Sequence, residues 1–442
     1  MLSRRQLLQG LGAGAVLAGA GPYVRAAAAV PEVLVIGAGA AGLVAARELA
    51  ATGVTVLVLE ARDRIGGRAF TDGSLGVAWD RGCSWLHASN VNPWVDYARR
   101  NDFEVRPDRF PREIYDGARR MDGAETAGYR AVSERVEREL RRAGGRGLDI
   151  PAEAALTQET LADPWYPMAM DELTGWEGVE PANFSVLDAH QFDRNGEDYV
   201  IPRGLGALVS HYAKGLDVKL KTPVTRIRWG GRSVTAETAA GPATANVAVV
   251  ALPSAIVAEG SVIFSPHLPA AVLQAHHDLP LGILEKIALR FKRNVFPTES
   301  TEFLRMKRDD GRGLGYLTRY TGENVCIAFA RGRLARDLEA RGEAAAVEQA
   351  LDELAAMLGG DVRKHFDRGA ATAWASDPYA RGAYSYCVPG RYGARARLTR
   401  PVGGRIVFAG EHTEQAAYGT LHGAHLSGVR AAAEARRLLG RA

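Results

Sequence analysis

The chain has 442 residues, 47% hydrophobic and 24% charged, an ordinary composition for a globular protein of two or three domains. Its formal net charge of +4 is small, and arginines are scattered among acids, which argues against nucleic-acid binding. Three cysteines, Cys83, Cys326 and Cys387, are too few and too irregularly spaced for a disulfide framework or a zinc site, so we expect no metal.

The N-terminal segment has the layout of a secretory signal. Arg4-Arg5 precedes an apolar run that ends near Ala20, and small residues follow at Ala26 to Ala29. The paired arginines indicate the twin-arginine route, which exports folded, cofactor-loaded proteins. Because the run is shorter than the ~20 residues that span a bilayer, we expect a signal peptide over residues 1–28, no stable membrane insertion, and a periplasmic protein.

The next stretch predicts a dinucleotide-binding βαβ unit. A strand over Val33 to Ile36 leads into the turn Gly37-Ala38-Gly39-Ala40-Ala41-Gly42, a helix to about Thr52, and a second strand over Val54 to Leu59. Gly37 permits the tight turn, Gly39 lets backbone approach a pyrophosphate, and Gly42 lets the helix pack on its strand. The second strand ends on Glu60, where an acid can bind a ribose hydroxyl and disfavours a 2′-phosphate, so FAD or NAD is expected.

A second glycine-containing loop, Ala61 to Arg68, follows Glu60 directly. Gly66 and Gly67 let backbone pass close to a ligand, and Arg68 can give a forked set of donors to a phosphate. We interpret this loop as the second half of a pyrophosphate clamp, although the same residues would be unremarkable in a surface loop.

The segment Asp80-Arg81-Gly82-Cys83-Ser84-Trp85-Leu86-His87 resembles the flavin-dependent amine oxidases, most closely the polyamine oxidases. In that family a similar stretch passes beside the flavin ring. The resemblance implies cofactor contacts from Ser84, Trp85 and Leu86, while Cys83 stands where many relatives have alanine. His87 is a candidate wall residue near the substrate nitrogen, or a histidine satisfied by local hydrogen bonds.

The middle of the chain is less informative. Residues 90 to 165 look helical and charged, with an amphipathic helix on Val132, Val136 and Leu140 that Gly144 to Gly147 ends. Strands are then expected over Val218 to Leu220, Val224 to Trp229 and Val247 to Leu252. The last is apolar throughout, as in strands buried on both faces. By resemblance, the backbone of Val224 meets the adenine.

A strand over Leu281 to Phe291 places Lys286 on one face with Leu284 and Ala288. A lysine in such a strand is usually an edge residue that reaches water. In the family, a lysine of a matching segment holds a water beside the reactive flavin nitrogen, and the resemblance implies this role for Lys286. Leu334 to Leu358 is read as one helical stretch, ended by Gly359-Gly360.

The segment Trp374 to Tyr386 resembles the polyamine-oxidase and histone-demethylase version of the family. By that match Trp374 packs on the flavin and Tyr384 forms one wall of an aromatic cage, whose π face attracts developing positive charge. Monoamine oxidases have at the position of Ala383 a cysteine that ties FAD covalently. Alanine cannot do this, so non-covalent FAD is implied.

The chain closes on a strand, Arg405 to Ala409, followed by Gly410-Glu411, and on a helix that begins at Thr420-Leu421. Glu411 can accept from ribitol hydroxyls, and the helix N-terminus points donors at the pyrimidine carbonyl of the flavin. Thr420 falls where monoamine oxidases place a second cage tyrosine. The half-open cage favours a long or bulky amine.

The sequence thus predicts an α/β protein with a discontinuous, doubly wound FAD-binding domain (30–88, 200–265 and 400–442) and an α+β substrate-binding domain with a mixed sheet (89–199 and 266–399). The resemblance implies oxidation of an amine C–N bond, with oxygen reoxidising the flavin. The predicted catalytic residues are Lys286, Tyr384, His87 and Thr420. The predicted cofactor-binding residues are Gly37, Gly39, Ala41, Gly42, Glu60, Ala61, Arg62, Gly67, Arg68, Ser84, Trp85, Leu86, Val224, Trp374, Gly410, Glu411, Thr420 and Leu421.

Three alternatives stay open: an amino-acid oxidase of the same fold, a dehydrogenase that passes electrons to a periplasmic carrier, and a non-enzymatic flavoprotein. Polyamine recognition would need acids along a tunnel, for which Glu180 or Asp188 could serve. The oligomeric state is left open.

Overall fold

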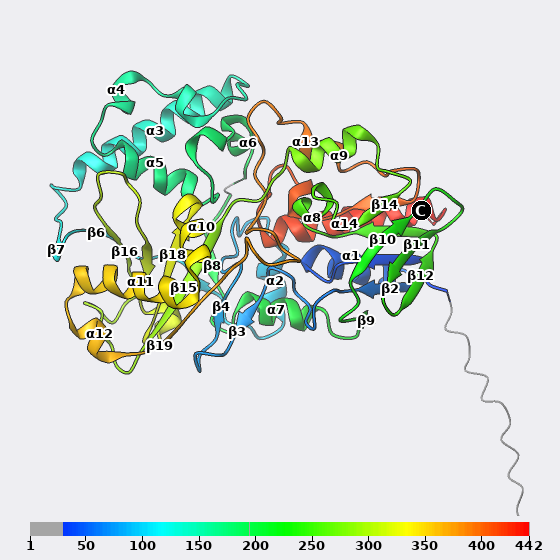
Figure 1. The fold of residues 1–442 in the computed structure, drawn as a ribbon, viewed down its shortest axis with the longest axis horizontal. Helices are drawn as coiled ribbons and strands as arrows, with labels where there is room; N and C mark the ends of the chain where they lie inside the picture. Colours follow the sequence, from blue (N-terminus) through cyan, green and yellow to red (C-terminus); the bar gives the residue numbers. More distant parts are fainter. Residues whose placement is uncertain (1–29, 194, 442) are drawn as a thin grey trace, which may run out of the picture. The chain divides into compact units, whose positions relative to one another are not determined.

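A computed structural model, which describes residues 30–193 and 195–441, contains a five-stranded parallel sheet in the order β20-β13-β1-β2-β9 (Figure 1). Its strands are β1 (Val33–Ile36), β2 (Val56–Leu59), β9 (Val218–Lys219), β13 (Val247–Val250) and β20 (Ile406–Phe408). Three separated stretches of sequence therefore build one sheet, as expected for a discontinuous dinucleotide-binding fold.

Both faces of the parallel sheet are buried. Val33 and Val35 pack with the helices α1 (Ala40–Ala51) and α14 (Leu421–Leu438) on one face. Leu34 and Ile36 pack on the other face, against the four-stranded sheet. This alternation explains why the strands read as continuous apolar runs. The four-stranded sheet has the order β12-β11-β10-β14, with strands β10 (Val224–Arg228), β11 (Val234–Thr238), β12 (Gly241–Ala245) and β14 (Ile263–Ser265).

The glycines of the β1–α1 turn have the local geometry that their spacing predicts. Gly37 has a φ of +102°, and an added Cβ would lie 2.7 Å from the carbonyl oxygen of Ala251. At Gly42 an added Cβ would lie 2.0 Å from the carbonyl oxygen of Gly37, so helix and turn approach more closely than a side chain permits. At Gly39 an added Cβ would meet nothing within 4 Å, so this side of the turn is open.

A seven-stranded mixed sheet of order β19-β15-β18-β17-β16-β6-β7 forms the second large sheet. Its strands are β6 (Arg112–Asp116), β7 (Arg119–Arg120), β15 (Leu284–Phe291), β16 (Phe303–Met306), β17 (Gly315–Leu317), β18 (Val325–Arg331) and β19 (Phe366–Ala371). All come from the stretches assigned above to the substrate-binding domain. Because Pro31–Ala442 forms one compact unit, the division into two domains stays a prediction.

The two faces of this sheet pack against different parts of the chain. Ile287, Leu289 and Phe291 of β15 face the helices α10 (Gly332–Arg341) and α11 (Glu343–Leu358), which lie beside the sheet in Figure 1. Leu284 and Ala288 face the opposite way, toward a cluster that includes Trp85, Trp176 and Tyr384. Lys286 shares this second face, as the alternation predicts.

The remaining elements are short or peripheral to these sheets. The helices are α2 (Pro93–Arg100), α3 (Ala127–Gly145), α4 (Gln158–Leu161), α5 (Tyr166–Gly175), α6 (Val186–His190), α7 (Leu205–Tyr212), α8 (Ser254–Ala258), α9 (Ala270–His277), α12 (Asp361–His365) and α13 (Ala394–Arg397). Two strand pairs complete the fold: β3 (Thr71–Asp72) with β4 (Trp79–Asp80), and β5 (Arg106–Pro107) with β8 (Tyr199–Val200). Val132, Val136 and Leu140 of α3 are buried, which confirms the predicted amphipathic stripe.

Several element boundaries differ from the sequence-based expectation, and at three places the reason is clear; elsewhere, β15 begins at Leu284 rather than Leu281 and β13 ends at Val250 rather than Leu252. Residues 90 to 165 are not wholly helical, because β6 pairs in parallel with β16, a partner far along the chain. The stretch over Leu334 to Leu358 is two helices, separated at Gly342, whose φ is +89°. Strand β2 starts at Val56 rather than Val54, because the N–H of Val54 is bonded to Leu49 O at the end of α1.

The predicted signal peptide, residues 1–28, lies outside the described residues. Within the part of the chain that the structure describes, no helix combines the length and the apolar character needed to cross a membrane.

The turn geometry predicts opposite effects for two alanine substitutions. Gly42→Ala should destabilise the fold by about 1–3 kcal/mol, because its Cβ would overlap the backbone at Gly37. Gly39→Ala should leave the stability of the apoprotein unchanged and weaken dinucleotide binding. Urea unfolding of both apoproteins, with FAD titration of each, measures the difference. A stable Gly42→Ala protein, or a Gly39→Ala protein with full FAD affinity, would contradict these assignments.

Candidate active site

A cavity of about 1250 Å³ lies at the carboxyl ends of the parallel strands. The residues that follow β1, β2, β13 and β20 all line it, including Gly37, Glu60, Ala251 and Gly410. Ligands of open parallel sheets bind at this edge. The cavity continues to the apolar face of the seven-stranded sheet, where Leu284, Lys286 and Phe303 line it.

All but two of the predicted site residues line this cavity. Gly42 does not, because it packs against the turn at Gly37. Leu86 is fully buried, and its backbone pairs with that of Tyr199. The predicted residues that do line the cavity are Gly37, Gly39, Ala41, Glu60, Ala61, Arg62, Gly67, Arg68, Ser84, Trp85, His87, Val224, Lys286, Trp374, Tyr384, Gly410, Glu411, Thr420 and Leu421.

The two glycine-containing loops lie against each other. Gly66 N donates to Ala38 O over 2.8 Å, and an added Cβ at Gly67 would lie 3.3 Å from Gly39 Cα. The Glu60 carboxylate holds both loops, since Oε2 accepts from Ala38 N at 2.7 Å and Oε1 from Arg62 N at 2.8 Å. The loops and the N-terminus of α1 thus form a cradle of open backbone, which suits a pyrophosphate.

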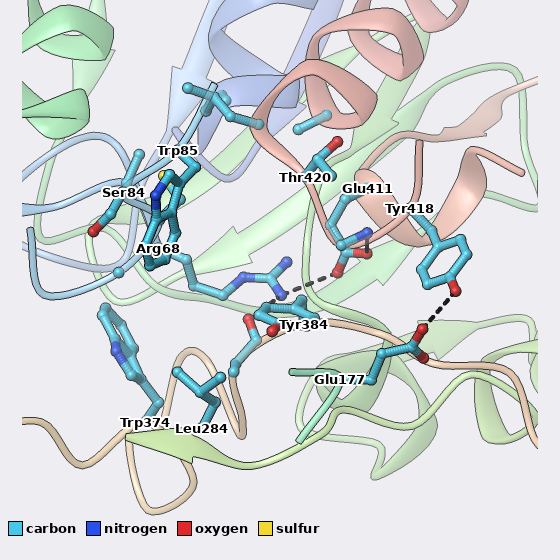
Figure 2. A pocket seen from close by; sticks show the side chains of 18 of the residues that line it. Arg68, Ser84, Trp85, Glu177, Leu284, Trp374, Tyr384, Glu411, Tyr418 and Thr420 are labelled. Atoms are coloured by element: carbon cyan, nitrogen blue, oxygen red, sulfur yellow. Dashed lines mark hydrogen bonds and ion pairs between the residues drawn. The ribbon is translucent and has the colours of Figure 1, made fainter. Parts of the chain in front are cut away.

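Glu411 is the most extensively hydrogen-bonded predicted cofactor residue. Its Oε1 accepts from Arg68 Nη1 at 3.0 Å (Figure 2) and from Ser385 N at 3.1 Å. Its Oε2 accepts from Ser385 Oγ at 2.7 Å and from Gly419 N at 2.8 Å. Burial alone would raise the pKa of Glu411, but Arg68 and the hydrogen bond from Ser385 hold that pKa down at about 2. The carboxylate is therefore ionised, and a polyol hydroxyl that donates to it must share an oxygen with one of these four donors or displace it.

Two of the three arginines of the second loop, Arg62 and Arg68, bind carboxylates. Arg68 Nη1 also donates to Ala383 O over 2.7 Å, which ties the loop to the segment that carries Tyr384. Arg62 makes a two-pronged ion pair with Asp377, with Nη1 at 2.8 Å and Nη2 at 2.5 Å. Both arginines therefore bind groups of the C-terminal part of the chain, and phosphate contacts by Arg68 stay a prediction.

Lys286 lies almost fully buried beside the segment 80–84. Its Nζ donates to Asp80 O at 3.0 Å, Gly82 O and Ser84 Oγ, and lies 5.7 Å from the ring centroids of both Trp85 and Phe329. Burial lowers the pKa of this ammonium to about 8, against the opposing effect of Asp80. The lysine thus brings a positive charge that titrates close to neutral pH to the wall of an apolar cavity.

The predicted flavin-facing aromatic residues are anchored through their indole N–H groups. Trp374 Nε1 donates to Arg81 O over 3.0 Å, and Trp85 Nε1 donates to Asp108 Oδ2 over 2.6 Å. Burial raises the pKa of Asp108 to about 6, although the hydrogen bond from Trp85 opposes this. The two indoles line the same cavity wall as Ser84 (Figure 2).

His87 and Thr420 both line the cavity, but each also has a local structural partner. His87 Nδ1 lies 2.9 Å from Asp198 Oδ2, and its ring stacks on that of Trp85. The hydroxyl of Thr420 caps helix α14, accepting from Gly423 N at 3.0 Å and donating to Ala417 O at 2.6 Å. The helix N-terminus predicted at Thr420-Leu421 is confirmed. The catalytic roles of both residues stay predictions.

Tyr384 is positioned by a junction of three chain segments at Gly282. Gly282 N donates to Tyr384 O over 2.9 Å, and an added Cβ at Gly282 would lie 1.9 Å from Glu177 O. The hydroxyl of Tyr384 donates to Trp176 O. The tyrosine is thereby fixed to the end of helix α5, which places Trp176 and Glu177 in the same cavity.

Sequence reasoning missed the pair Glu177 and Tyr418. Tyr418 Oη donates to Glu177 Oε1 over 2.8 Å, and both side chains line the cavity opposite Trp85 (Figure 2). Tyr418 directly precedes the recognised Gly419-Thr420 and could have been considered with it. Glu177 follows α5 without any local pattern, and only its distant packing against Gly282 places it here.

The two acids suggested for a substrate tunnel do not line the cavity, so that suggestion is wrong. Glu180 lies 3.3 Å from Arg312 and accepts from Arg333 N. Asp188 is buried in a two-pronged ion pair with Arg395. Both have basic partners elsewhere in the fold, which a linear sequence does not reveal.

Comparison with known proteins identifies relatives over nearly the whole chain. The family described as flavin containing amine oxidoreductase matches residues 40–179 and 151–436. Polyamine oxidase 2 of Arabidopsis thaliana is 32% identical, over 92% of this chain and 88% of its own length. Lysine-specific histone demethylase 1 homolog 1 of the same plant is 31% identical over 93% of this chain, which spans 53% of that longer protein.

A solved structure shows the same fold. A triple mutant of putrescine oxidase, made for redesign of cofactor binding, superimposes with a TM-score of 0.78 at 21% identity, covering 93% of this chain and 99% of its own. The predicted α/β fold, with a parallel sheet of dinucleotide-binding type and a mixed sheet, is confirmed. The chain therefore belongs to the flavin-containing amine oxidoreductase family.

Proposed function

We propose that this enzyme uses non-covalent FAD to oxidise a C–N bond of a primary or secondary amine, in particular a polyamine, with oxygen as the electron acceptor. One observation carries the proposal: a single cavity joins the dinucleotide cradle at Gly39 to a wall formed by Tyr384, Tyr418 and Glu177. The polyamine oxidases among the relatives support the substrate class.

The residues fit FAD because open backbone and an ionised carboxylate occur where the cofactor needs them. Gly39 and Gly67 would hold the pyrophosphate, Glu60 the ribose and Glu411 the ribitol. Bound there, FAD would accept the hydride equivalent from the carbon next to the amine nitrogen. Ala383 offers no thiol, and burial raises the pKa of the Cys83 thiol to about 12, which supports non-covalent binding.

The substrate end of the cavity favours a cationic molecule. Carboxylates outnumber arginines on the lining there, and Arg109 and Arg112 already pair with Glu197 and Glu172. The lining carboxylates outside the dinucleotide cradle are Asp108, Glu134, Glu137, Glu172, Glu177, Asp193, Glu197 and Asp198. A substrate with several ammonium groups would meet opposite charge, whereas an amino-acid carboxylate would meet like charge.

The amine must reach Tyr384 in its neutral form, because its lone pair supports loss of hydride from the adjacent carbon. An apolar, aromatic wall disfavours the ammonium form of the reacting nitrogen by desolvation. Glu177 can at the same time hold another ammonium of the same molecule. Export to the periplasm by the twin-arginine route is part of the proposal, and rests on Arg4-Arg5.

Anaerobic flavin bleaching against a panel of amines tests this function. Spermidine, spermine and putrescine should reduce the bound flavin, whereas benzylamine and L-amino acids should reduce it far more slowly. Admission of air should then restore the yellow colour and release hydrogen peroxide in equal amount. Bleaching by amino acids alone would favour the amino-acid oxidase alternative. Fast reduction followed by very slow reoxidation in air would favour an electron carrier, and no reduction by any amine would refute the proposal.

Lys286→Met should slow flavin reoxidation or reduction at least several-fold, because a buried positive charge stabilises negative charge that develops nearby. The Lys286 pKa of about 8 adds a pH signature: the ammonium is protonated below that pH, so the wild-type reoxidation rate should fall as the pH rises through 8. The variant should show no such step. Stopped-flow measurement of both half-reactions from about pH 6 to about pH 10 decides this, because that range lies on both sides of the Lys286 pKa of about 8.

The matched control is Lys214→Met, at an exposed lysine that does not line the cavity. Its half-reactions and pH profile should equal those of the wild type. Unchanged rates in both half-reactions of Lys286→Met, with full flavin occupancy, would remove this lysine from the mechanism.

A further inference from the structure

Arg395, in the short helix α13, is a fully buried cation that the proposed chemistry does not use. Its Nε lies 3.1 Å from Asp188 Oδ1 and its Nη2 lies 2.8 Å from Asp188 Oδ2, a two-pronged ion pair between side chains that are 0% and 2% exposed. Burying a charged pair is costly unless every donor and acceptor is satisfied. The remaining donors of the Arg395 guanidinium therefore also need partners in the protein.

One remaining contact leads to the predicted ribitol carboxylate. Arg395 Nη1 donates to Ser385 Oγ over 2.7 Å, and Ser385 Oγ donates to Glu411 Oε2 over 2.7 Å. The chain Asp188–Arg395–Ser385–Glu411 is continuous and buried throughout. Arg395 is also one of the cations that lower the pKa of Glu411.

A second contact leads to the amine side of the cavity. The Arg395 guanidinium carbon lies 4.0 Å from the ring centroid of Tyr418, within the range of a cation–π contact. That ring lines the cavity, and its hydroxyl donates to Glu177 (Figure 2). The guanidinium thus contacts the ring of a tyrosine whose hydroxyl is held by Glu177.

We propose that Arg395 is a positioning residue that fixes two walls of the active site at once: Glu411 through Ser385, and Tyr418 with Glu177 through ring stacking. The first arm sets affinity for FAD. The second arm sets affinity for the amine and rests on the proposed function. Asp188 orients the guanidinium, and its Oδ1 also accepts from Gln415 Nε2 at 2.8 Å, close to Tyr418 in sequence.

Arginine is required for this arrangement because its planar fork bonds a carboxylate with two donors, leaves a third donor for Ser385, and presents a flat face to an aromatic ring. Lysine would keep the charge opposite Asp188 but has no planar face and no fork. The substitution Arg395→Lys therefore keeps the positive charge and removes the planar fork, whereas Arg395→Met removes both.

The experiment compares Arg395→Met and Arg395→Lys with the wild type and with a control, Arg308→Met. Arg308 also pairs with a buried carboxylate, Glu353, over 2.8 Å, but does not line the cavity. Each protein is titrated with FAD by flavin fluorescence, and flavin reduction is measured anaerobically against spermidine concentration. Thermal unfolding of each apoprotein reports stability.

Arg395→Met should raise the FAD dissociation constant and the spermidine concentration for half-maximal reduction at least about fivefold each, the loss expected for about one hydrogen bond to a charged group. Arg308→Met should leave both values within about twofold of wild type, a change too small to signify a lost interaction. It should lower thermal stability less than Arg395→Met, because the Arg308 side chain is exposed. Arg395→Lys should recover stability but neither affinity.

A double-mutant cycle with Tyr418→Phe tests the second arm directly. If Arg395 acts through Tyr418, the effects of the two substitutions on spermidine affinity should be non-additive. Additive effects would overturn the Tyr418 arm. Unchanged FAD affinity in Arg395→Met would overturn the Glu411 arm, as would full recovery by Arg395→Lys.

The two proposals fail in different ways. If no amine reduces the wild-type flavin, the proposed function fails, while the FAD titrations still decide whether Arg395 acts on Glu411. If the wild type oxidises spermidine and Arg395→Met loses only stability, the positioning role fails and the function stands.

Discussion

The cavity depends on backbone contacts that are too close for any residue but glycine. An added Cβ would lie 1.6 Å from Arg68 O at Gly82, 1.9 Å from Glu177 O at Gly282, and 1.9 Å from Ala417 O at Gly423. No side chain fits at these three points, so each segment can sit only where it does. Lys286, Tyr384 and Glu411 come from three separate segments, and the contact at Gly282 fixes the segment that carries Tyr384 against the chain at Glu177.

The site also contains buried charges, and hydrogen bonds from the protein stabilise them. Glu411 stays ionised because Arg68 and Ser385 outweigh the cost of burial, whereas burial dominates at Lys286 and lowers its pKa to about 8. The two groups differ because a carboxylate that accepts four hydrogen bonds is well solvated by protein, while carbonyl and hydroxyl oxygens only partly replace water around an ammonium. The site therefore keeps a fixed negative charge and a titratable positive one.

The sequence predicted local motifs well and long-range contacts poorly. The turn at Gly37 to Gly42 and the helix start at Thr420 were predictable, because turn chemistry, capping and burial leave a signal within a few residues. Strand β6 was missed, because its parallel partner lies far along the chain and charged residues flank its buried pair. Asp188 could not be distinguished from a tunnel acid, since its partner Arg395 is 207 residues away.

Lys286 can stabilise negative charge in the cavity although its ammonium has no free N–H donor. Its three N–H groups already face Asp80 O, Gly82 O and Ser84 Oγ, so a water bound to this ammonium, as the family resemblance implies, must displace one of them or share it. The charge itself needs no such exchange. Two unit charges 4 Å apart still interact by about 4 kcal/mol at an effective dielectric constant near 20. The three protein acceptors therefore hold the ammonium in place, and Lys286 acts on the cavity through the electrostatic field of its charge rather than through a free N–H group.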